Sequence, residues 1–351
     1  MFGIKQQDGK KMKIVVTGSQ GFIGGYLVEE LLSQGHTVVG VDNYSKYGFL
    51  SKSHDNHPDF SLVNTNLENS ADLDAVLMDA DHLVAGAAKI GGITYFHKFA
   101  YDLLAKNERI MATTCDAAIK AFECGSLQKV TYISSSMVFE SATSFPSKEG
   151  DELSSPPPLS SYGFQKLSTE YFARAAWDQY GLPFTIVRPF NCIGIGEARA
   201  VSDHYEQSGN ISLAMSHVVP DLIQKILKGQ DPLHILGSGN QIRHYTYGGD
   251  LAKGISLAIQ SDAAFNQDFN LSTPTGHSVL ELANLIYRKI THLDSNPEIV
   301  MDKPYEYDVQ MRVPATEKAK SLLGFEATTS LDSALDEIIP WVQGAIKEGI
   351  I

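Results

Sequence analysis

The stretch that decides the fold runs from Lys13 to Gly24 and reads KIVVTGSQGFIG. Four of its first five residues are apolar or β-branched and predict a buried strand, and three glycines with the spacing GxxGxxG follow before a helical pattern. Glycines in such a turn let backbone N–H groups approach a pyrophosphate and let the helix pack closely on the strand. We therefore expect a dinucleotide-binding loop at Gly18, Gly21 and Gly24.

An acidic residue follows the second expected strand. Asp42 lies 18 residues after Gly24, where a carboxylate can accept hydrogen bonds from the ribose hydroxyls of adenosine. The same charge would repel a 2′-phosphate, so NAD is favoured over NADP, although Lys46 nearby would weaken that preference. The alternative is a glycine turn that serves only packing, with Asp42 solvated at the end of a strand.

Short apolar runs alternate with helical patterns through the first half of the chain. This alternation predicts an α/β fold with a doubly wound parallel sheet, Rossmann-like and covered by helices on both faces. The pattern changes after Pro189, so we expect an NAD-binding domain over residues 12–190. A smaller mixed substrate lobe would occupy most of residues 191–351, with some of that chain returning to the sheet. The expected strands are residues 13–17, 37–41, 60–63, 82–85, 130–134 and 184–188, and the expected helices are residues 22–34, 70–78, 106–123, 161–180, 215–228 (interrupted by Pro220) and 331–347.

The bulk composition excludes several classes of protein. The 351 residues carry a formal net charge of -13, which argues against nucleic acid or an anionic membrane surface as the main partner. Three scattered cysteines are too few for a disulfide framework or a zinc site, and the histidines form no HExxH pattern, so no metal is expected. With no run long enough to span a bilayer and no secretory signal, we expect a cytoplasmic protein.

A second group of residues has side chains suited to acid–base catalysis. Tyr162 and Lys166 are four residues apart near the start of an expected helix, so both side chains lie on one face. An ammonium beside a phenol stabilises the phenolate and lowers the phenol pKa towards that of a general base, and a positively charged nicotinamide would act in the same direction. Ser134, Ser135 and Ser136 end an expected strand and would present hydroxyls to the same cleft, where one could relay a sugar proton.

These motifs together resemble the extended short-chain dehydrogenase/reductase family, in its NAD-dependent nucleotide-sugar epimerase/dehydratase branch. The resemblance runs from Lys13 to about the end of the chain. It also includes the segments Arg188–Asn191, Gly239–Arg243 and 308–312.

The resemblance implies a role for each matching residue. Tyr162 would be the base, Lys166 would hold the nicotinamide ribose, and Ser135 would bind the sugar hydroxyl. The implied cofactor contacts are Gly18, Gly21, Phe22, Ile23, Gly24, Asp42, Asn43, Asn66, Leu67, Ala87, Ala88, Lys89, Asn107, Ser134, Tyr162, Lys166 and Pro189. The implied contacts to a nucleotide-diphosphate sugar are Ser135, Ser136, Asn191, His217, Val218, Arg243 and Arg312, where guanidinium groups would grip the diphosphate.

Departures from the family pattern narrow the reaction. Dehydratases of the family carry a Thr-Asp-Glu triplet where this chain has Ser135-Ser136-Met137, and decarboxylases tend to carry Glu at the third position. The 3,5-epimerases and the reductases that form GDP-fucose use Cys there. Because Met137 cannot shuttle protons, we expect a 4-epimerase that acts through a transient 4-keto sugar and keeps its NAD bound. The segment Phe139-Glu140 also replaces the usual Tyr-Gly, and the nucleotide base stays open.

Two alternatives remain at this point. One is an oxidoreductase or dehydratase of the same family that releases a keto product. The other, of a different class, is an inactive NAD-sensing protein, against which an intact Ser135, Tyr162 and Lys166 argue. The resemblance also implies a homodimer formed through the helices expected at residues 106–123 and 161–180.

Overall fold

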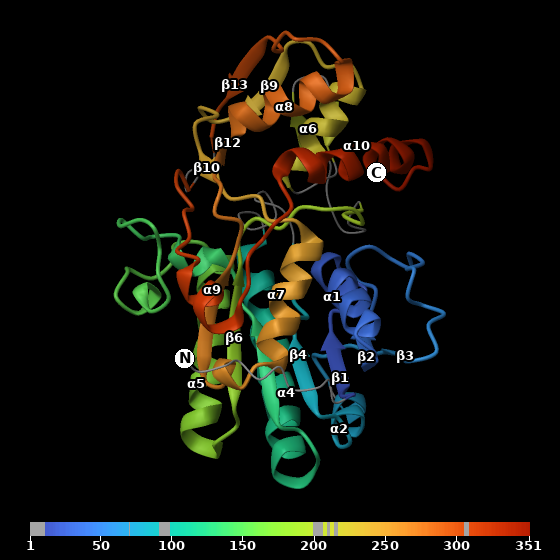
Figure 1. Cartoon of the computed structure of the whole chain (residues 1–351), viewed down its shortest axis with the longest axis vertical. Coiled ribbons are helices and arrows are strands. Elements are labelled where there is room, and N and C mark those ends of the chain that lie inside the picture. Colours follow the sequence, from blue (N-terminus) through green and yellow to red (C-terminus); the bar gives the residue numbers. More distant parts are fainter. Residues whose placement is uncertain are drawn as a thin grey trace.

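The computed structural model describes residues 11–69, 71–90, 99–198, 206–208, 211–213, 217–304 and 309–351. A seven-stranded parallel sheet lies at the centre, in the order β11-β6-β5-β4-β1-β2-β3 (Figure 1). This confirms the predicted doubly wound α/β fold. The strands are β1 (Lys13–Thr17), β2 (Thr37–Asp42), β3 (Phe60–Asn64), β4 (His82–Ala85), β5 (Lys129–Ile133), β6 (Phe184–Pro189) and β11 (Gln267–Leu271).

Helices cover both faces of the sheet because successive side chains of each strand point to opposite sides. On β1, Val15 packs into the core formed with α2 (Ala71–Leu77), α4 (Ala100–Cys124) and α5 (Ser161–Tyr180). Its neighbours Ile14 and Val16 pack on the opposite face. The helices of that face are α1 (Phe22–Ser33), α7 (Gly248–Gln260) and α9 (Glu317–Leu323).

The chain reverses direction across the sheet next to β1. From β1 it passes to β2 and β3 on one side, and β4, β5 and β6 follow on the other side. The loops after β1 and β4 therefore diverge and leave a crevice at the carboxyl ends of the strands, which is where open α/β sheets bind ligands. The fold thus places the glycine loop at this crevice.

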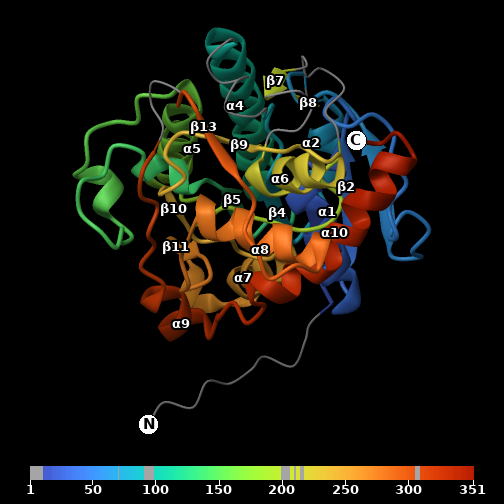
Figure 2. The same cartoon turned by 90° about the horizontal axis from the view of Figure 1, so that it is seen from above.

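A C-terminal lobe with its own core covers the carboxyl ends of the strands (Figures 1 and 2). Its apolar core contains Leu222, Ile223, Leu282 and Leu335. The lobe consists of α6 (Val218–Leu227), β9 (Leu233–Leu236), α8 (Val279–Thr291), β13 (Ile299–Asp302) and α10 (Leu331–Lys347). Two short strand pairs accompany it, β7 (Glu206–Ser208) with β8 (Ile211–Leu213), and β10 (Ile242–Arg243) with β12 (His277–Ser278). The 3-10 turns η1 (Ser136–Phe139), η2 (Asp151–Leu153) and η3 (Asp262–Ala264) lie elsewhere in the chain.

The structure differs from the expected elements in several places. The helix expected at residues 106–123 begins earlier, at Ala100. Pro220 does not interrupt its helix: α6 begins at Val218, so the proline lies in the first turn, where a missing N–H breaks no intrahelical hydrogen bond. β11, which the strand assignment omitted, joins the sheet beside β6. Within the described part of the chain, no helix is both long and apolar enough to cross a membrane.

Candidate active site

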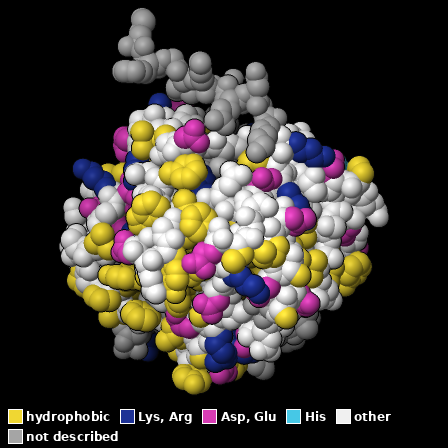
Figure 3. Space-filling model, turned by 90° about the horizontal axis from the view of Figure 1, so that it is seen from below, with side chains coloured by type: hydrophobic (Ala, Val, Ile, Leu, Met, Phe, Trp, Pro, Cys, Tyr) yellow, Lys and Arg dark blue, Asp and Glu magenta, His cyan; other side chains and the backbone are white. Residues whose placement is uncertain are grey.

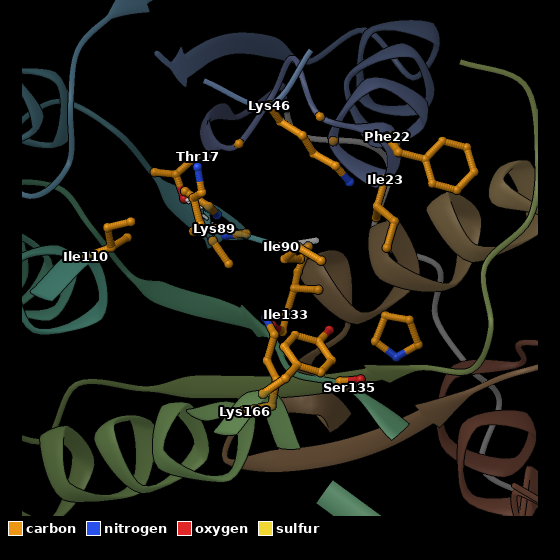
Figure 4. A pocket seen from close by; sticks show the side chains of 18 of the residues that line it. Thr17, Phe22, Ile23, Lys46, Lys89, Ile90, Ile110, Ile133, Ser135 and Lys166 are labelled. Carbon is orange, nitrogen blue, oxygen red and sulfur yellow. Dashed lines mark hydrogen bonds between the residues drawn. The ribbon is translucent and has the colours of Figure 1, made fainter. Parts of the chain in front are cut away.

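A cavity of about 560 Å³ lies at the carboxyl ends of the central strands, beneath the C-terminal lobe. Its lining joins Thr17 at the end of β1 and Asp42 at the end of β2 with Arg312 from the C-terminal part of the chain. Figure 4 shows Ser135 and Lys166 at one side of this cavity and Lys46 across from them. The cavity therefore brings together residues that are far apart in the sequence.

The glycine loop has the shape that a close pyrophosphate contact requires. A Cβ at position 24 would lie 2.0 Å from the carbonyl oxygen of Gly18, so no other residue fits there. Gly18 itself has φ +77, a conformation that favours glycine. No side chain caps α1, whose N-cap is Gly21, so the N–H groups of its first turn are available to an anion. This cradle fits the phosphates of a dinucleotide.

Asp42 holds the loop as well as lining the cavity. Its Oδ2 accepts a hydrogen bond from the backbone N–H of Gln20 at 3.0 Å, and its Oδ1 accepts one from Tyr44 N at 2.8 Å. A carboxylate oxygen accepts more than one hydrogen bond, so both can still receive ribose hydroxyls. The position of Asp42 fits the predicted contact to the adenosine ribose.

Asn107 differs from its predicted role, because it is buried and does not line the cavity. Its side chain accepts a hydrogen bond from Lys89 N at 2.6 Å and donates one to Lys89 O at 2.9 Å. Thr17, at the end of the neighbouring strand β1, has a similar function, since its Oγ1 accepts hydrogen bonds from Gly86 N at 3.0 Å and from Ala87 N at 3.2 Å. Both side chains fix the backbone of residues 86–89, which forms one wall of the cavity.

Ser135, Tyr162 and Lys166 line the cavity together, although β5 carries the first to the site and α5 carries the other two. The Ser135 hydroxyl accepts a hydrogen bond from Met137 N at 3.2 Å, which caps η1. Lys166 is buried and donates a hydrogen bond from Nζ to the carbonyl oxygen of Ile133 at 2.8 Å. The strand end and the first turns of α5 are thereby tied together.

The electrostatics of Tyr162 differ from the expectation. The pKa of Tyr162 is raised above its ordinary value, because burial outweighs the Ser135 hydroxyl and the charge of Arg312, which both act to lower it. Burial also lowers the pKa of Lys166 to about 8, although the carboxylate of Glu170 acts to raise it. The charge of Arg312, which we had expected only to bind diphosphate, thus also acts to lower the pKa of Tyr162.

Beneath Ser134 lies a buried network of ionised side chains. The Ser134 hydroxyl donates a hydrogen bond to Glu170 Oε1 at 2.6 Å, so this side chain points to the network as well as bordering the cavity. Arg188, fully buried, donates to the two carboxylate oxygens of Glu170 at 2.7 Å each. It also forms ion pairs with Glu152 at 2.9 Å and Asp268 at 2.8 Å.

The predicted substrate residues gather at the side of the cavity that faces the lobe. Arg312 Nη1 donates to the Asn191 side-chain oxygen at 3.4 Å, and Arg243 Nη1 donates to the carbonyl of Ile242 at 2.9 Å. The imidazole of His217 contacts the carboxylate of Glu197, also at this side. Val218 does not line the main cavity but an adjoining one of about 80 Å³, which Asn191, His217 and Arg243 share.

The other predicted residues border the main cavity, and several bordering residues were not predicted. Thr17 is the last residue of β1, a position that could have signalled it, whereas Glu140 was noted only as a departure from the family pattern. The remaining predicted residues in the lining are Phe22, Ile23, Asn43, Asn66, Leu67, Ala87, Ala88, Lys89, Ser136 and Pro189, and unpredicted ones include Thr17, Tyr44, Tyr47, Lys106, Ile110, Glu140 and Cys192.

Comparison with known proteins assigns the chain to a family. The model of the NAD dependent epimerase/dehydratase family matches residues 14–272. The chain belongs to this family. Membership confirms the predicted family, NAD as the cofactor, and an enzyme as the class of protein.

Individual relatives match nearly the whole chain. A Bacillus subtilis protein named an uncharacterized UDP-glucose epimerase is 28% identical, over 94% of this chain and 98% of its own. A UDP-N-acetyl-alpha-D-glucosaminuronate decarboxylase of Bacillus cytotoxicus is 27% identical, over 94% of this chain and 98% of its own. The crystal structure of UDP-glucose 4-epimerase with UDP-glucose from Thermotoga maritima superposes with a TM-score of 0.79 at 25% identity, covering 95% of this chain and all of that one.

Proposed function

We propose that the protein is an NAD-dependent 4-epimerase of nucleotide sugars, with UDP as the nucleotide. One observation carries the proposal: Ser135, Tyr162 and Lys166 line the same cavity as the glycine loop, and Met137 lies beside them without a group that exchanges protons. Epimerisation at C4 needs a base and a hydride acceptor, whereas elimination of water needs further acids and bases. The choice of UDP rests on the names of the relatives.

Each side chain has a task in this reaction. The Tyr162 phenolate oxygen takes the proton of the C4 hydroxyl, and the Ser135 hydroxyl donates a hydrogen bond to the same sugar oxygen as it becomes a carbonyl. Arg312 stabilises the phenolate by its charge, and Lys166 holds the nicotinamide ribose. NAD, held by the glycine loop, Asp42 and Lys166, would supply the hydride chemistry at C4.

The diphosphate would bind at the lobe side of the cavity. Arg243 and Arg312 approach it from two segments that are distant in the sequence, and Asn191 lies between the strand end and Arg312. Each guanidinium group can donate two parallel hydrogen bonds to diphosphate oxygens, and this bidentate contact fixes the orientation of the nucleotide. Anchoring the diphosphate leaves the sugar as the part that can turn over between the two hydride transfers.

A panel of UDP-, GDP-, dTDP- and CDP-sugars, followed by NMR with purified protein and no added NAD, tests the proposal. Conversion of a sugar into its C4 epimer is the expected result, and Tyr162→Phe should abolish it while NAD stays bound. A net change in NADH absorbance, loss of carbon dioxide from a uronic acid, or near-normal turnover by Tyr162→Phe would contradict the proposal.

The surface of α4 and α5 supports a homodimer. Five aromatic side chains on these helices are exposed, with exposed fractions of 80% for Tyr101, 47% for Phe164, 57% for Tyr171, 40% for Trp177 and 42% for Tyr180. Figure 3 views the end of the molecule away from the lobe and shows hydrophobic side chains among charged ones there. Exposed apolar groups of this size mark contact surfaces more often than solvent-facing ones, so we assign these helices to a two-fold interface.

A further inference from the structure

Glu140 places a carboxylate in the wall of the cavity near the catalytic tyrosine. It follows η1 directly and lines the cavity together with Ser135, Ser160 and Tyr162. Its side chain is half-buried. The nucleotide is bound from the lobe side, so this wall faces the part of the substrate that points away from the diphosphate, which is the sugar ring and its substituents.

The carboxylate is held in a fixed place. Its Oε2 accepts hydrogen bonds from the backbone N–H and from the hydroxyl of Ser160, both at 2.9 Å. Ser160 is the N-cap of α5, and its hydroxyl oxygen in turn accepts a hydrogen bond from Gly163 N at 3.0 Å. A Cβ at Gly163 would lie 2.9 Å from Glu140 Oε2, so glycine at that position lets the carboxylate approach the helix.

Glu140 also lies at the N-terminus of α5, through its hydrogen bonds to Ser160. A helix N-terminus favours a carboxylate, and α5 is a helix of 20 residues. Among the described residues, the ion pairs of the structure join other carboxylates to Lys and Arg side chains and do not include Glu140. The charge thus stands beside the sugar pocket without a cation bound to it within the described chain.

We infer that Glu140 determines which sugars the enzyme accepts, by excluding rings that carry a carboxylate and admitting uncharged ones. The inference rests on the proposed function, because it presumes that Tyr162 acts at C4 of a sugar. Two like charges close together in the cavity repel each other, whereas a hydroxymethyl group can donate a hydrogen bond to Glu140. The substrate class is therefore neutral nucleotide sugars, not nucleotide uronic acids.

Arg312 is the competing influence, since its positive charge acts on Tyr162 from the same cavity. If Arg312 bound a sugar carboxylate in place of the diphosphate, the wild-type protein would prefer the uronic acid. The preference of the wild-type protein thus decides between the two charges.

The test compares two substrates that differ only in the group on C5. For UDP these are UDP-galactose and UDP-galacturonic acid, and the same pair is taken for another nucleotide if the panel selects one. We expect wild-type kcat/KM to favour the neutral sugar by roughly a hundredfold, a difference that a few kcal/mol of repulsion produces. Glu140→Gln keeps an oxygen that accepts from Ser160, and it should reduce that preference by about tenfold or more, mainly by raising kcat/KM for the uronic acid.

The matched control is Glu123→Gln, which removes the same charge from an exposed position near the end of α4. It should leave the preference unchanged. Calorimetric binding of the two compounds to NAD-loaded protein separates this inference from the proposed function: if neither compound is epimerised but Glu140→Gln still changes the ratio of their dissociation constants, only the 4-epimerase proposal fails. The role of Glu140 would be overturned by a wild-type preference for the uronic acid, or by equal effects of Glu140→Gln on both compounds. If the variant does not fold, the wild-type preference alone decides.

Discussion

Replacing Glu170 with glutamine tests whether the buried network under the site stabilises the fold. Glu170 accepts two hydrogen bonds from Arg188 at 2.7 Å and one from the Ser134 hydroxyl at 2.6 Å. Both partners of the ion pair are excluded from solvent. Glutamine has nearly the same shape, so the change removes the charge without creating a cavity, and it turns an N–H₂ group towards a guanidinium that also donates.

The size of the effect follows from what remains around Arg188. Breaking a buried ion pair by removing one partner costs about 3–5 kcal/mol, because the other charge is left buried without compensation. Arg188 keeps ion pairs with Glu152 at 2.9 Å and Asp268 at 2.8 Å. We therefore expect a loss near the lower end, about 3 kcal/mol in the free energy of unfolding.

Equilibrium unfolding in urea, followed by circular dichroism and by tryptophan fluorescence, measures this loss where the two probes coincide. Glu123→Gln, at an exposed position, serves as the control and should change the free energy by less than about 0.5 kcal/mol. If Glu170→Gln lost less than about 1 kcal/mol, the buried pair would not be the stabilising contact that its geometry indicates.

Three further predictions concern the site and the assembly. Burial lowers the pKa of Lys166 to about 8, and because the charged form is the one that acts, kcat/KM should fall as the pH rises through that value; a flat profile from neutral pH to pH about 10 would contradict this. Gly24→Ala should weaken NAD binding, measured by calorimetry, by about a hundredfold or more, because the new Cβ would lie 2.0 Å from the Gly18 carbonyl oxygen. The control variant Gly344→Ala, whose Cβ would meet no atom within 4 Å beyond its chain neighbours and the backbone of its own helix, should bind NAD normally. Tyr171→Glu should lower the mass measured by light scattering from that of the proposed dimer to that of a monomer, and an unchanged mass would exclude α5 from the interface.

Local patterns in the sequence predicted most of the sheet. On β1 the strand bounds agreed with the structure, since a run of apolar residues before a glycine turn can be buried only as a strand in this setting. The turn at Gly18 and the spacing of Tyr162 from Lys166 are also local, because backbone conformation and helix geometry act over a few residues. These local features were sufficient to predict the family and its NAD-binding loop.

Asn107 and Arg312 show what local patterns could not predict. The family resemblance assigned Asn107 to the cofactor, but its contacts are with the backbone of Lys89, across 18 residues of chain. It assigned Arg312 to the diphosphate, and only the packing of the C-terminal segment showed that its charge also acts on Tyr162. The pKa of that phenol depends on burial, which exists only once the chain has folded.

The sequence by itself determined the alternation of strands and helices, the glycine loop after β1 and the placement of Tyr162 and Lys166 on one face of α5, because each depends on residues that are near one another along the chain. The tertiary structure alone decided that Arg188 would meet three carboxylates in the core and that Glu140 would be held against Ser160 beside the sugar pocket. Charges interact through space, and their strength depends on distance and on the water that packing excludes, so these contacts are fixed only when distant segments come together.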